Sequence, residues 1–325
     1  MTKTILLVVN FGGPRNQEEV SSFLTTLLTD EEVIRTPLPA FLQKALFRRV
    51  AKKRAPLVAH DYKKIGGGSP IFADTEWMAA SLSQALEIPA LAFHRYLEST
   101  HAAFLESLYK INAEEILVFP LFPQFSYATT GSIAKWFADH MTPVLTKRMS
   151  WIKSYPQHKS YVNAFSAVVR GFLKEKGLDE SETLLFFSAH GLPCQFIEEG
   201  DVYQKECQAS YAAIAKQFPK AKSLLAYQSK FGRGKWLEPS TGDLCKNPKE
   251  FIGDKKHIVF LPLSFSSDHI ETLFEIEELY VTPLKEQGFS AYRCPALGRS
   301  LSWVNAAAEI IKEGSFVSNQ MLIRR

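Results

Sequence analysis

Residues 183–190 read TLLFFSAH, and this stretch decides the fold class. A run this apolar predicts a central strand of a parallel sheet, buried on both faces. Other runs of strand length occur at 4–9, 90–96, 115–121, 223–227 and 257–263. Helical periods separate most of them, at 17–28, 100–111, 130–141, 157–176, 203–217 and 270–286. The alternation predicts an α/β fold of parallel sheets flanked by helices.

Length and composition indicate a globular protein of two domains. The 325 residues are 46% hydrophobic and 22% charged, and two domains of roughly 150 residues are the usual division for such a length. Lysine and arginine (38) exceed aspartate and glutamate (34) by only four, with no basic stripe, so we expect no nucleic-acid partner. No apolar run approaches the roughly 18 residues of a spanning helix, so we expect a protein that is soluble or at most rests on a membrane surface.

The cysteines indicate a reducing compartment. Cys194, Cys207, Cys245 and Cys294 are scattered and form no C-x-x-C pair. Neither a disulfide framework nor a zinc knuckle is therefore indicated, and we expect the protein to be cytoplasmic.

Aromatic, hydroxyl and imidazole side chains follow the predicted strands. Ligands of parallel α/β folds bind beyond the carboxyl ends of the strands, so these residues should share one edge of each sheet. They suit a flat, apolar ligand with a few polar groups. The segments concerned include Asn10-Phe11, Phe93-His94-Arg95-Tyr96, Gln124-Phe125-Ser126-Tyr127, Ala189-His190-Gly191, Gln228-Ser229-Lys230 and Asp268-His269.

His190 has two interpretations. A single histidine after an apolar strand is commonly a hydrogen-bonded core residue. The turn that Gly191-Leu192-Pro193 predicts would instead leave the imidazole at the rim, where a general base or a metal ligand must stand.

The helix that begins near Ser267 or Asp268 carries a row of carboxylates. Glu271, Glu275 and Glu278 are spaced i, i+4, i+7 and share one face of an α-helix. One interpretation is a solvated acidic face near a helix N-terminus. The other is a conduit for protons or hydrated Fe(II), which the position beside His269 favours.

Two further segments allow a binding role. Residues 65–70, IGGGSP, could cradle phosphate, but they match no nucleotide-binding motif, and a tight turn is the simpler interpretation. Residues 37–57 mix apolar and basic side chains without an acid. If Phe41, Leu42, Ala45, Leu46 and Val50 line one face and the cations another, this is an interfacial membrane helix; the alternative is an ordinary surface helix.

Taken together, these residues resemble the ferrochelatase family over essentially the whole chain. Seven motifs occur in family order: Asn10-Phe11-Gly12-Gly13-Pro14, residues 62–70, Arg95-Tyr96, Pro123-Gln124-Phe125-Ser126 with Thr129-Thr130-Gly131-Ser132, Ser188-Ala189-His190, Gln228-Ser229-Lys230 with Trp236-Leu237, and residues 267–273. The resemblance implies two Rossmann-like domains, each with a four-stranded parallel sheet, and porphyrin bound between them. We expect the first domain to span 1–168 and the second 169–298, with the C-terminal segment of about 299–325 returning to the first.

The resemblance also implies roles for particular residues. His190 and Glu271 match the active-site pair of the family, as acid–base groups and as Fe(II) ligands. His190, neutral near pH 7, could accept a pyrrole proton or bind the metal, and Glu271 could do the complementary job. Glu275 and Glu278 would form the conduit. Candidates for holding or supporting the porphyrin are Phe11, Lys63, Lys64, Arg95, Tyr96, Ser126, Trp236 and His269.

The sequence departs from the family pattern at three places. Animal members have methionine at the position of Phe11 and an arginine pair at Lys63-Lys64. Many members hold an iron–sulfur cluster through C-terminal cysteines, whereas no cysteine follows Cys294 here. We therefore expect no cluster and no permanently bound cofactor, with Fe(II) as a substrate.

The expected activity is insertion of Fe(II) into protoporphyrin IX. The alternatives are a chelatase for coproporphyrin or another tetrapyrrole, and a porphyrin or haem carrier without catalysis. A nucleotide-dependent ligase is disfavoured because the chain has no phosphate loop.

Overall fold

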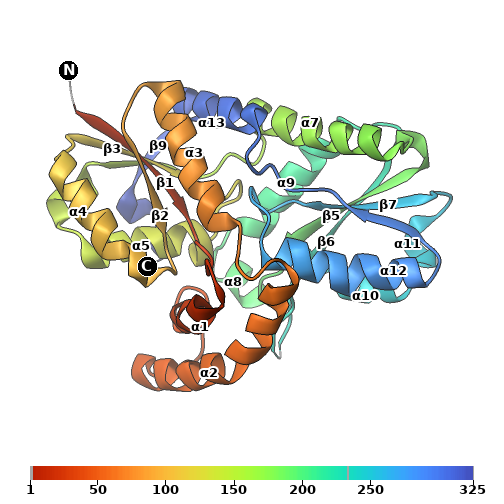
Figure 1. Ribbon diagram of the computed structural model, residues 1–325, viewed down its shortest axis with the longest axis horizontal. Helices are drawn as coiled ribbons and strands as arrows, with labels where there is room; N and C mark the ends of the chain where they lie inside the picture. Colours follow the sequence, from red (N-terminus) through yellow and green to blue (C-terminus); the bar gives the residue numbers. More distant parts are fainter. Residues whose placement is uncertain (1–2, 233, 325) are drawn as a thin grey trace. The chain divides into compact units, whose positions relative to one another are not determined.

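The computed structural model describes residues 3–232 and 234–324, and the chain forms two compact units (Figure 1). Unit 1 comprises Met1–Ser154 and Ala307–Arg325, and unit 2 comprises Tyr155–Ala306. Unit 1 ends before the boundary that we expected after residue 168. The reason is that helix α7 (Lys159–Lys176) is continuous across that position and packs against α9 (Tyr203–Ala215) of unit 2. The returning C-terminal segment starts at Ala307, inside α13 (Leu301–Glu313), rather than near residue 299.

Unit 1 is built on a sheet of four parallel strands with one antiparallel strand at its edge. The antiparallel strand, at the C-terminal end of the chain, makes this sheet larger than the four-stranded sheet that we expected. In spatial order the strands are β2 (Ala90–His94), β1 (Thr4–Asn10), β3 (Glu115–Pro120), β4 (Met149–Ile152) and β9 (Phe316–Ser318).

Helices of unit 1 connect these strands and cover the sheet. Helix α3, which the sequence analysis did not predict, packs on β1 and β2, and α1 packs on α2. The helices are α1 (Val20–Leu28), α2 (Ala40–Lys64), α3 (Ile71–Leu86), α4 (His101–Ile111), a short π-helix (Tyr127–Gly131), α5 (Ser132–His140) and α6 (Pro143–Lys147), with 3₁₀ turns at Gln17–Glu19, Glu98–Thr100 and Asn319–Leu322.

Unit 2 contains the expected four-stranded parallel sheet. Its spatial order is β6 (Lys222–Gln228), β5 (Thr183–His190), β7 (His257–Pro262) and β8 (Ser290–Arg293). Besides α7 and α9, its helical elements are a 3₁₀ turn (Glu180–Glu182), α8 (Cys194–Glu198), α10 (Thr241–Lys246), α11 (Lys249–Ile252), a π-helix (Glu271–Val281), α12 (Thr282–Glu286) and the start of α13.

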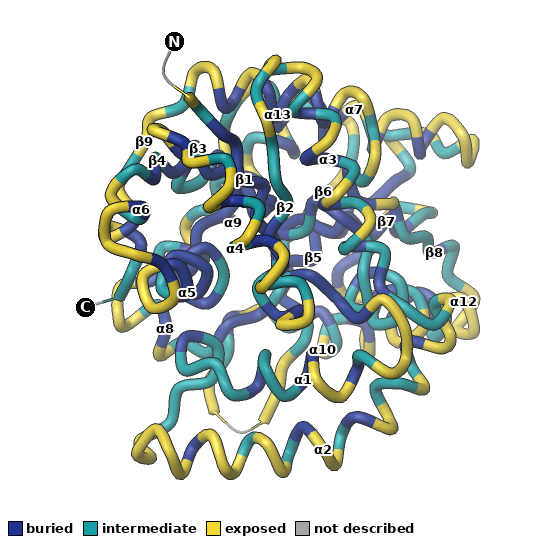
Figure 2. Tube along the Cα trace, turned by 60° about the vertical axis from the view of Figure 1, so that its left-hand side comes forward, coloured by how far each residue is buried: buried dark blue, intermediate teal, exposed yellow. Residues whose placement is uncertain are grey.

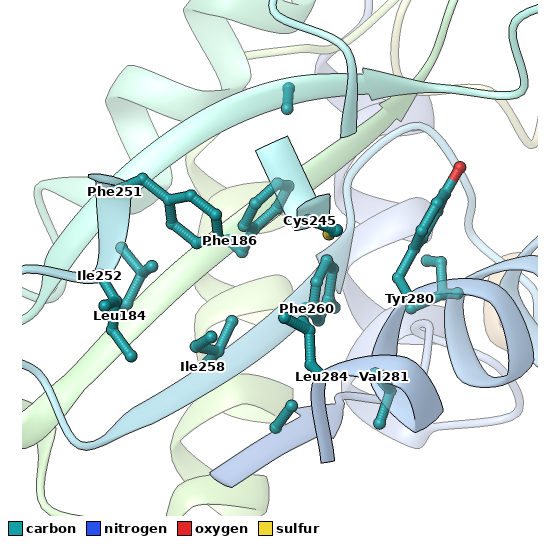
Figure 3. Close-up of a cluster of buried hydrophobic side chains, with 13 residues drawn as sticks. Leu184, Phe186, Cys245, Phe251, Ile252, Ile258, Phe260, Tyr280, Val281 and Leu284 are labelled. Carbon is teal, nitrogen blue, oxygen red and sulfur yellow. The ribbon is translucent and has the colours of Figure 1, made fainter. Parts of the chain in front are cut away.

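The core of unit 2 forms around β5 and β7. Seven of the eight residues of β5 are buried, as predicted for a strand covered on both faces. Phe186 of β5 stacks on Phe260 of β7 with ring centroids 4.6 Å apart, and the rings of Phe186 and Phe251 meet edge to face with centroids 5.5 Å apart (Figure 3). This cluster fixes the strand that ends at His190.

Each sheet reverses its winding direction beside its central strand. In unit 1 the chain places β2 on one side of β1 and β3 on the other; in unit 2 it places β6 on one side of β5 and β7 on the other. Such a reversal separates the connecting loops and is the usual ligand position in open α/β sheets. Phe11 follows β1 and His190 ends β5, so both lie at these positions.

Candidate active site

His190 is held at the carboxyl end of β5 by its neighbours in unit 2. Its carbonyl accepts a hydrogen bond from the Tyr203 hydroxyl at 2.9 Å. The chain then turns at Gly191, whose N–H donates to the Gln228 carbonyl at 2.8 Å. A Cβ at position 191 would lie 2.7 Å from that carbonyl oxygen, so the close approach requires glycine. The imidazole is left half-buried at the rim, as the turn predicted.

The structure brings His190 and Glu271 together. Nδ1 of His190 lies 2.7 Å from Oε2 of Glu271, which is the first residue of the π-helix. Both side chains are partly exposed, at 34% and 28%. A carboxylate at this distance orients the ring and favours a proton on Nδ1, so that Nε2 is the atom with a free lone pair.

Ser229 connects this pair to a second carboxylate. Its backbone N–H donates to Glu275 Oε1 at 2.8 Å, and its hydroxyl contacts Glu275 Oε2 and lies 3.3 Å from Glu271 Oε2. Ser229 has φ +63°, a left-handed conformation that is uncommon for a residue with a side chain. This strained backbone directs both the N–H and the hydroxyl of one residue at the carboxylates.

Glu278 is not part of this row, and the prediction for it was wrong. The spacing i, i+4, i+7 describes one face of an α-helix, but Glu271–Val281 is a π-helix with i→i+5 hydrogen bonds. A π-helix has more residues in each turn, so residues four apart stay nearly aligned while residues seven apart separate. Glu278 is exposed to solvent, and Glu275 instead accepts a hydrogen bond from Tyr280 at 2.7 Å.

The charges of the site shift three pKa values. Burial lowers the pKa of His190, but attraction to Glu271, the hydrogen bond that His190 donates to it and attraction to Glu275 together outweigh burial and leave the pKa raised above 6.5. Burial likewise raises the pKa of Glu271, and the attraction of His190 overcomes this and lowers it to about 2. For Glu275, burial and the neighbouring Glu271 raise the pKa. His190 is therefore more protonated near pH 7 than the sequence-based expectation of a neutral ring.

Removal of the Glu271 charge should reverse the shift at His190. In Glu271→Gln the desolvation of His190 is no longer opposed by the carboxylate, so the pKa of His190 should fall below its ordinary value of 6.5, whereas in the wild type it lies above. NMR titration of the histidine ring signals measures the pKa of His190 in the wild type and in Glu271→Gln. The spectrum of His190→Gln identifies which signal belongs to His190. Equal pKa values of His190 in the wild type and in Glu271→Gln would contradict the ion pair.

His269 lies beside the pair. Its ring is mostly buried, with Nε2 4.0 Å from Glu271 Oε2 and the ring of Phe265 at 4.2 Å. Burial lowers the pKa of His269. Trp236 also belongs to this region: its ring lies beside Gly191, and its backbone bridges to Pro193 in the turn after His190.

In unit 1, Phe11 and Tyr96 form an aromatic group at the carboxyl edge of the sheet. The half-buried ring of Phe11 lies 5.1 Å from Tyr96 and 4.9 Å from Phe122. Ser126 is buried and begins the short π-helix by accepting a hydrogen bond from the N–H of Ala128. The structure thus gives Ser126 a local structural role.

Arg95 is engaged within unit 1. Its guanidinium lies 2.7 Å from Asp30 and 3.0 Å from the Ser132 hydroxyl, and its side chain is only 12% exposed. The Tyr96 hydroxyl donates to the same Asp30 carboxylate. Arg95 therefore supports this edge through Asp30 instead of presenting a charge to a ligand. Lys63 and Lys64, at the end of α2, are both exposed.

Comparisons with known proteins identify the family. A model of the ferrochelatase family matches residues 3–315. The ferrochelatase of Chlamydia abortus is 42% identical over 324 residues, covering 100% of both chains. The chain belongs to the ferrochelatase family. The ferrochelatase of Chlamydia pneumoniae is 41% identical over 100% of this chain and 97% of that protein. This membership confirms the resemblance read from the seven motifs.

Solved chelatase structures share the fold. CbiX, described as the terminal enzyme of sirohaem biosynthesis in denitrifying bacteria, has a TM-score of 0.50 at 14% identity and covers 95% of this chain and 98% of its own. SirB from Bacillus subtilis, solved with Fe³⁺, has a TM-score of 0.53 at 13% identity, covering 96% and 95%. At such identities the likeness concerns the fold, and it agrees with the parallel sheets of both units.

Sequence reasoning did not assign roles to Ser229, Asp30 or Tyr203. Ser229 lies in a motif that was recognised, and its place directly after β6 was the available signal. Asp30 and Tyr203 carry no such signal, because their partners are distant along the chain.

The described part of the chain has neither a side-chain cluster suited to a metal ion nor a membrane-spanning helix. The four cysteines are free thiols. Within residues 3–232 and 234–324, no group of three or more His, Cys, Asp or Glu side chains could hold a metal ion. Among the described helices, none combines the length and apolar character needed to cross a membrane.

Proposed function

We propose that this member of the ferrochelatase family inserts Fe(II) into protoporphyrin IX to give protohaem and two protons, the last step of haem biosynthesis. The observation that carries the residue assignment is the 2.7 Å contact between His190 and Glu271 at the point where the sheet of unit 2 reverses its winding. The pair supplies an oriented imidazole and a carboxylate at a partly exposed rim, which is what proton removal and metal transfer require.

Insertion of iron into a porphyrin requires loss of two pyrrole protons and of water from the metal. In our proposal the neutral form of His190 accepts a pyrrole proton at Nε2, while Glu271 holds Nδ1–H and stabilises the imidazolium that results. Glu271 and His190 are also the candidate ligands for the incoming Fe(II). Glu275, which Ser229 connects to Glu271, is the next acceptor along the π-helix.

The aromatic side chains suit a flat macrocycle. Phe11 in unit 1 and Trp236 in unit 2 have partly buried rings near the carboxyl edges of their sheets, and the buried Tyr96 supports Phe11. We infer that binding energy from the periphery of the porphyrin holds the ring bent and exposes its nitrogens. Lys63 and Lys64 are the candidate partners of the propionates, because both are exposed cations.

An anaerobic assay of the purified protein with Fe(II) and either protoporphyrin IX or coproporphyrin III tests the activity. We expect the bands of the iron porphyrin to appear faster with protoporphyrin IX, and to disappear in Glu271→Gln. Faster turnover of coproporphyrin III would overturn the substrate assignment. Spectral shifts without insertion of iron into either porphyrin would identify a carrier instead.

We also propose that the protein is cytoplasmic and carries no resident cofactor. The four thiols are unpaired, as is typical of a reducing compartment. The purified protein should contain no inorganic sulfide and show no iron–sulfur absorbance; stoichiometric sulfide would overturn this.

Helix α2 supports a proposal of peripheral membrane contact. It lies at the margin of unit 1 and is largely exposed in Figure 2. Phe41 is 71% exposed and Leu57 64%, and Leu42 and Leu46 are 46% each. The cations Arg48, Arg49, Lys52 and Lys53 are exposed on the same helix. The expected separation of apolar and basic residues onto different faces is wrong, because Phe41, Arg48 and Lys52 are spaced i, i+7, i+11 and share one exposed face of the helix. An exposed face that mixes the two suits an anionic lipid surface.

Binding to lipid vesicles measures this contact. Each basic residue near an anionic surface contributes about 1 kcal/mol, so replacing Arg48, Arg49, Lys52 and Lys53 with glutamine should weaken sedimentation with phosphatidylglycerol vesicles by up to about 10³-fold at low salt. Phe41→Ser with Leu57→Ser should weaken it further.

A matched control removes equal charge elsewhere, in Lys174→Gln, Lys205→Gln, Lys249→Gln and Lys312→Gln, all of which are exposed. It should bind like the wild type. Equal loss in both quadruple variants, or no sedimentation of the wild type at any salt concentration, would contradict a docking role of α2.

A further inference from the structure

Arg293 connects the segment that precedes the π-helix to a residue within that helix. It is the last residue of β8, and its Nη1 donates to Oδ1 of Asp268 at 2.9 Å, just before the helix begins. Its Nε lies 3.6 Å from Oε2 of Glu277, further along the same helix. The Arg293 side chain is only 17% exposed. One guanidinium therefore links the segment just before Glu271–Val281 to the middle of that helix.

The π conformation of this helix needs such support. π-Helices are rare and usually extend over a single turn, whereas this one covers 11 residues. Rewinding to an α-helix would rotate Glu277 relative to Asp268, because each turn would contain fewer residues. A single guanidinium could then no longer reach both carboxylates, so the contacts of Arg293 select the π winding.

Further hydrogen bonds lead from Asp268 to the candidate active site. Oδ1 of Asp268 also accepts a hydrogen bond from the Thr272 hydroxyl at 2.7 Å. The same Thr272 oxygen accepts the N–H of His269 at 3.0 Å. Three hydrogen bonds in series thus connect Arg293, through Asp268 and Thr272, to the backbone N–H of His269.

We propose that Arg293 is a positioning residue, which holds the π winding and thereby keeps Glu271 on His190 and Glu275 on Ser229. This inference rests on the proposed function for its effect on rate. Its effect on the helix is independent of that function. Arg293 acts through Asp268 and Glu277 and touches none of the groups assigned to the chemistry.

The test compares three variants. Arg293→Met keeps the side-chain length and removes both contacts. Arg293→Lys keeps a charge that can reach one carboxylate but not bridge two. Lys285→Met is the control, since Lys285 also lies 3.6 Å from Glu277 but, among the described residues, forms no ion pair with Asp268.

Misplacing a reacting group by about 1 Å costs up to about 10²-fold in rate, so kcat for iron insertion should fall by up to about 10²-fold in Arg293→Met. The KM for porphyrin should stay unchanged, Arg293→Lys should recover part of kcat, and Lys285→Met should resemble the wild type. Amide hydrogen exchange of residues 271–281 should accelerate in Arg293→Met while exchange in β5 and β7 does not.

Wild-type exchange in 271–281 together with wild-type kcat in Arg293→Met would overturn the proposal. Equal losses of kcat in Arg293→Met and Lys285→Met would also overturn it, because a general loss of stability would explain both. If Arg293→Met does not fold, Arg293→Lys tests the proposal. A wild-type kcat and wild-type hydrogen exchange in Arg293→Lys would overturn the claim that one side chain must contact both Asp268 and Glu277. If the wild type inserts no iron, the exchange experiment still tests the winding, so the two failures are distinguishable.

Discussion

Replacing His190 with alanine is expected to lower kcat for insertion of Fe(II) into protoporphyrin IX by about 10²–10⁴-fold, the usual contribution of a positioned acid–base group. The reason is that Glu271 holds Nδ1 of His190 at 2.7 Å, which leaves Nε2 as the nitrogen that can accept a proton. The binding of porphyrin, measured by fluorescence quenching, should change little, because the aromatic candidates Phe11 and Trp236 remain. His190→Ala should also eliminate any pH dependence of kcat that comes from the imidazole.

The control for this variant is His257→Ala. His257 is a partly buried histidine at the other end of the unit 2 sheet, where Nδ1 contacts the Ser290 hydroxyl at 2.9 Å. It should retain kcat. Substantial turnover in His190→Ala would overturn the assignment of His190, and equal loss in both variants would indicate a general effect on folding.

Replacing Phe186 with alanine is expected to destabilise unit 2 by about 3–5 kcal/mol. Phe186 is fully buried in the central strand and lies between Phe260 and Phe251 (Figure 3). Removing the ring leaves a cavity that a parallel sheet paired on both sides of β5 cannot easily close. The same strand carries His190, so loss of activity on mild heating should accompany loss of structure.

Hydrogen exchange of the amides in β5 and β7 under urea measures this change within unit 2. The measurement is confined to unit 2 because the chain has two units, and two-state unfolding is a property of small single domains. Phe231→Ala, at an exposed position of the same unit, should change stability by no more than about 0.5 kcal/mol. A Phe186→Ala protein as stable as Phe231→Ala would contradict the assignment of this cluster as the core.

The longer strands could be predicted from the sequence, and the shortest could not. The apolar runs at 183–188 and 257–263 coincide with β5 and β7, since burial on both faces demands continuous apolar side chains. Strands β4 and β8 have four residues each and β9 has three, too few for a periodic pattern. They form because longer neighbours offer unpaired backbone groups.

The candidate site, like the strands, could be predicted from the sequence only in part. Position at the end of an apolar strand was enough to single out His190, and helical spacing was enough to place Glu271 and Glu275 on one face. Spacing could not distinguish a π-helix from an α-helix, so the place of Glu278 was wrong. Arg95 also follows a strand, but its charge pairs with Asp30, 65 residues away along the chain.

The sequence by itself determined the α/β class, the family and the strand ends at which His190 and Phe11 stand. These properties depend on local runs of burial and on motifs, which are written in consecutive residues. Only the tertiary structure decided the π winding of Glu271–Val281, the pairing of Arg95 with Asp30, the exposed face of α2 and the bridge made by Arg293. Each of these depends on contacts between side chains from separate elements, and the energy of such contacts exists only when packing has placed the elements together.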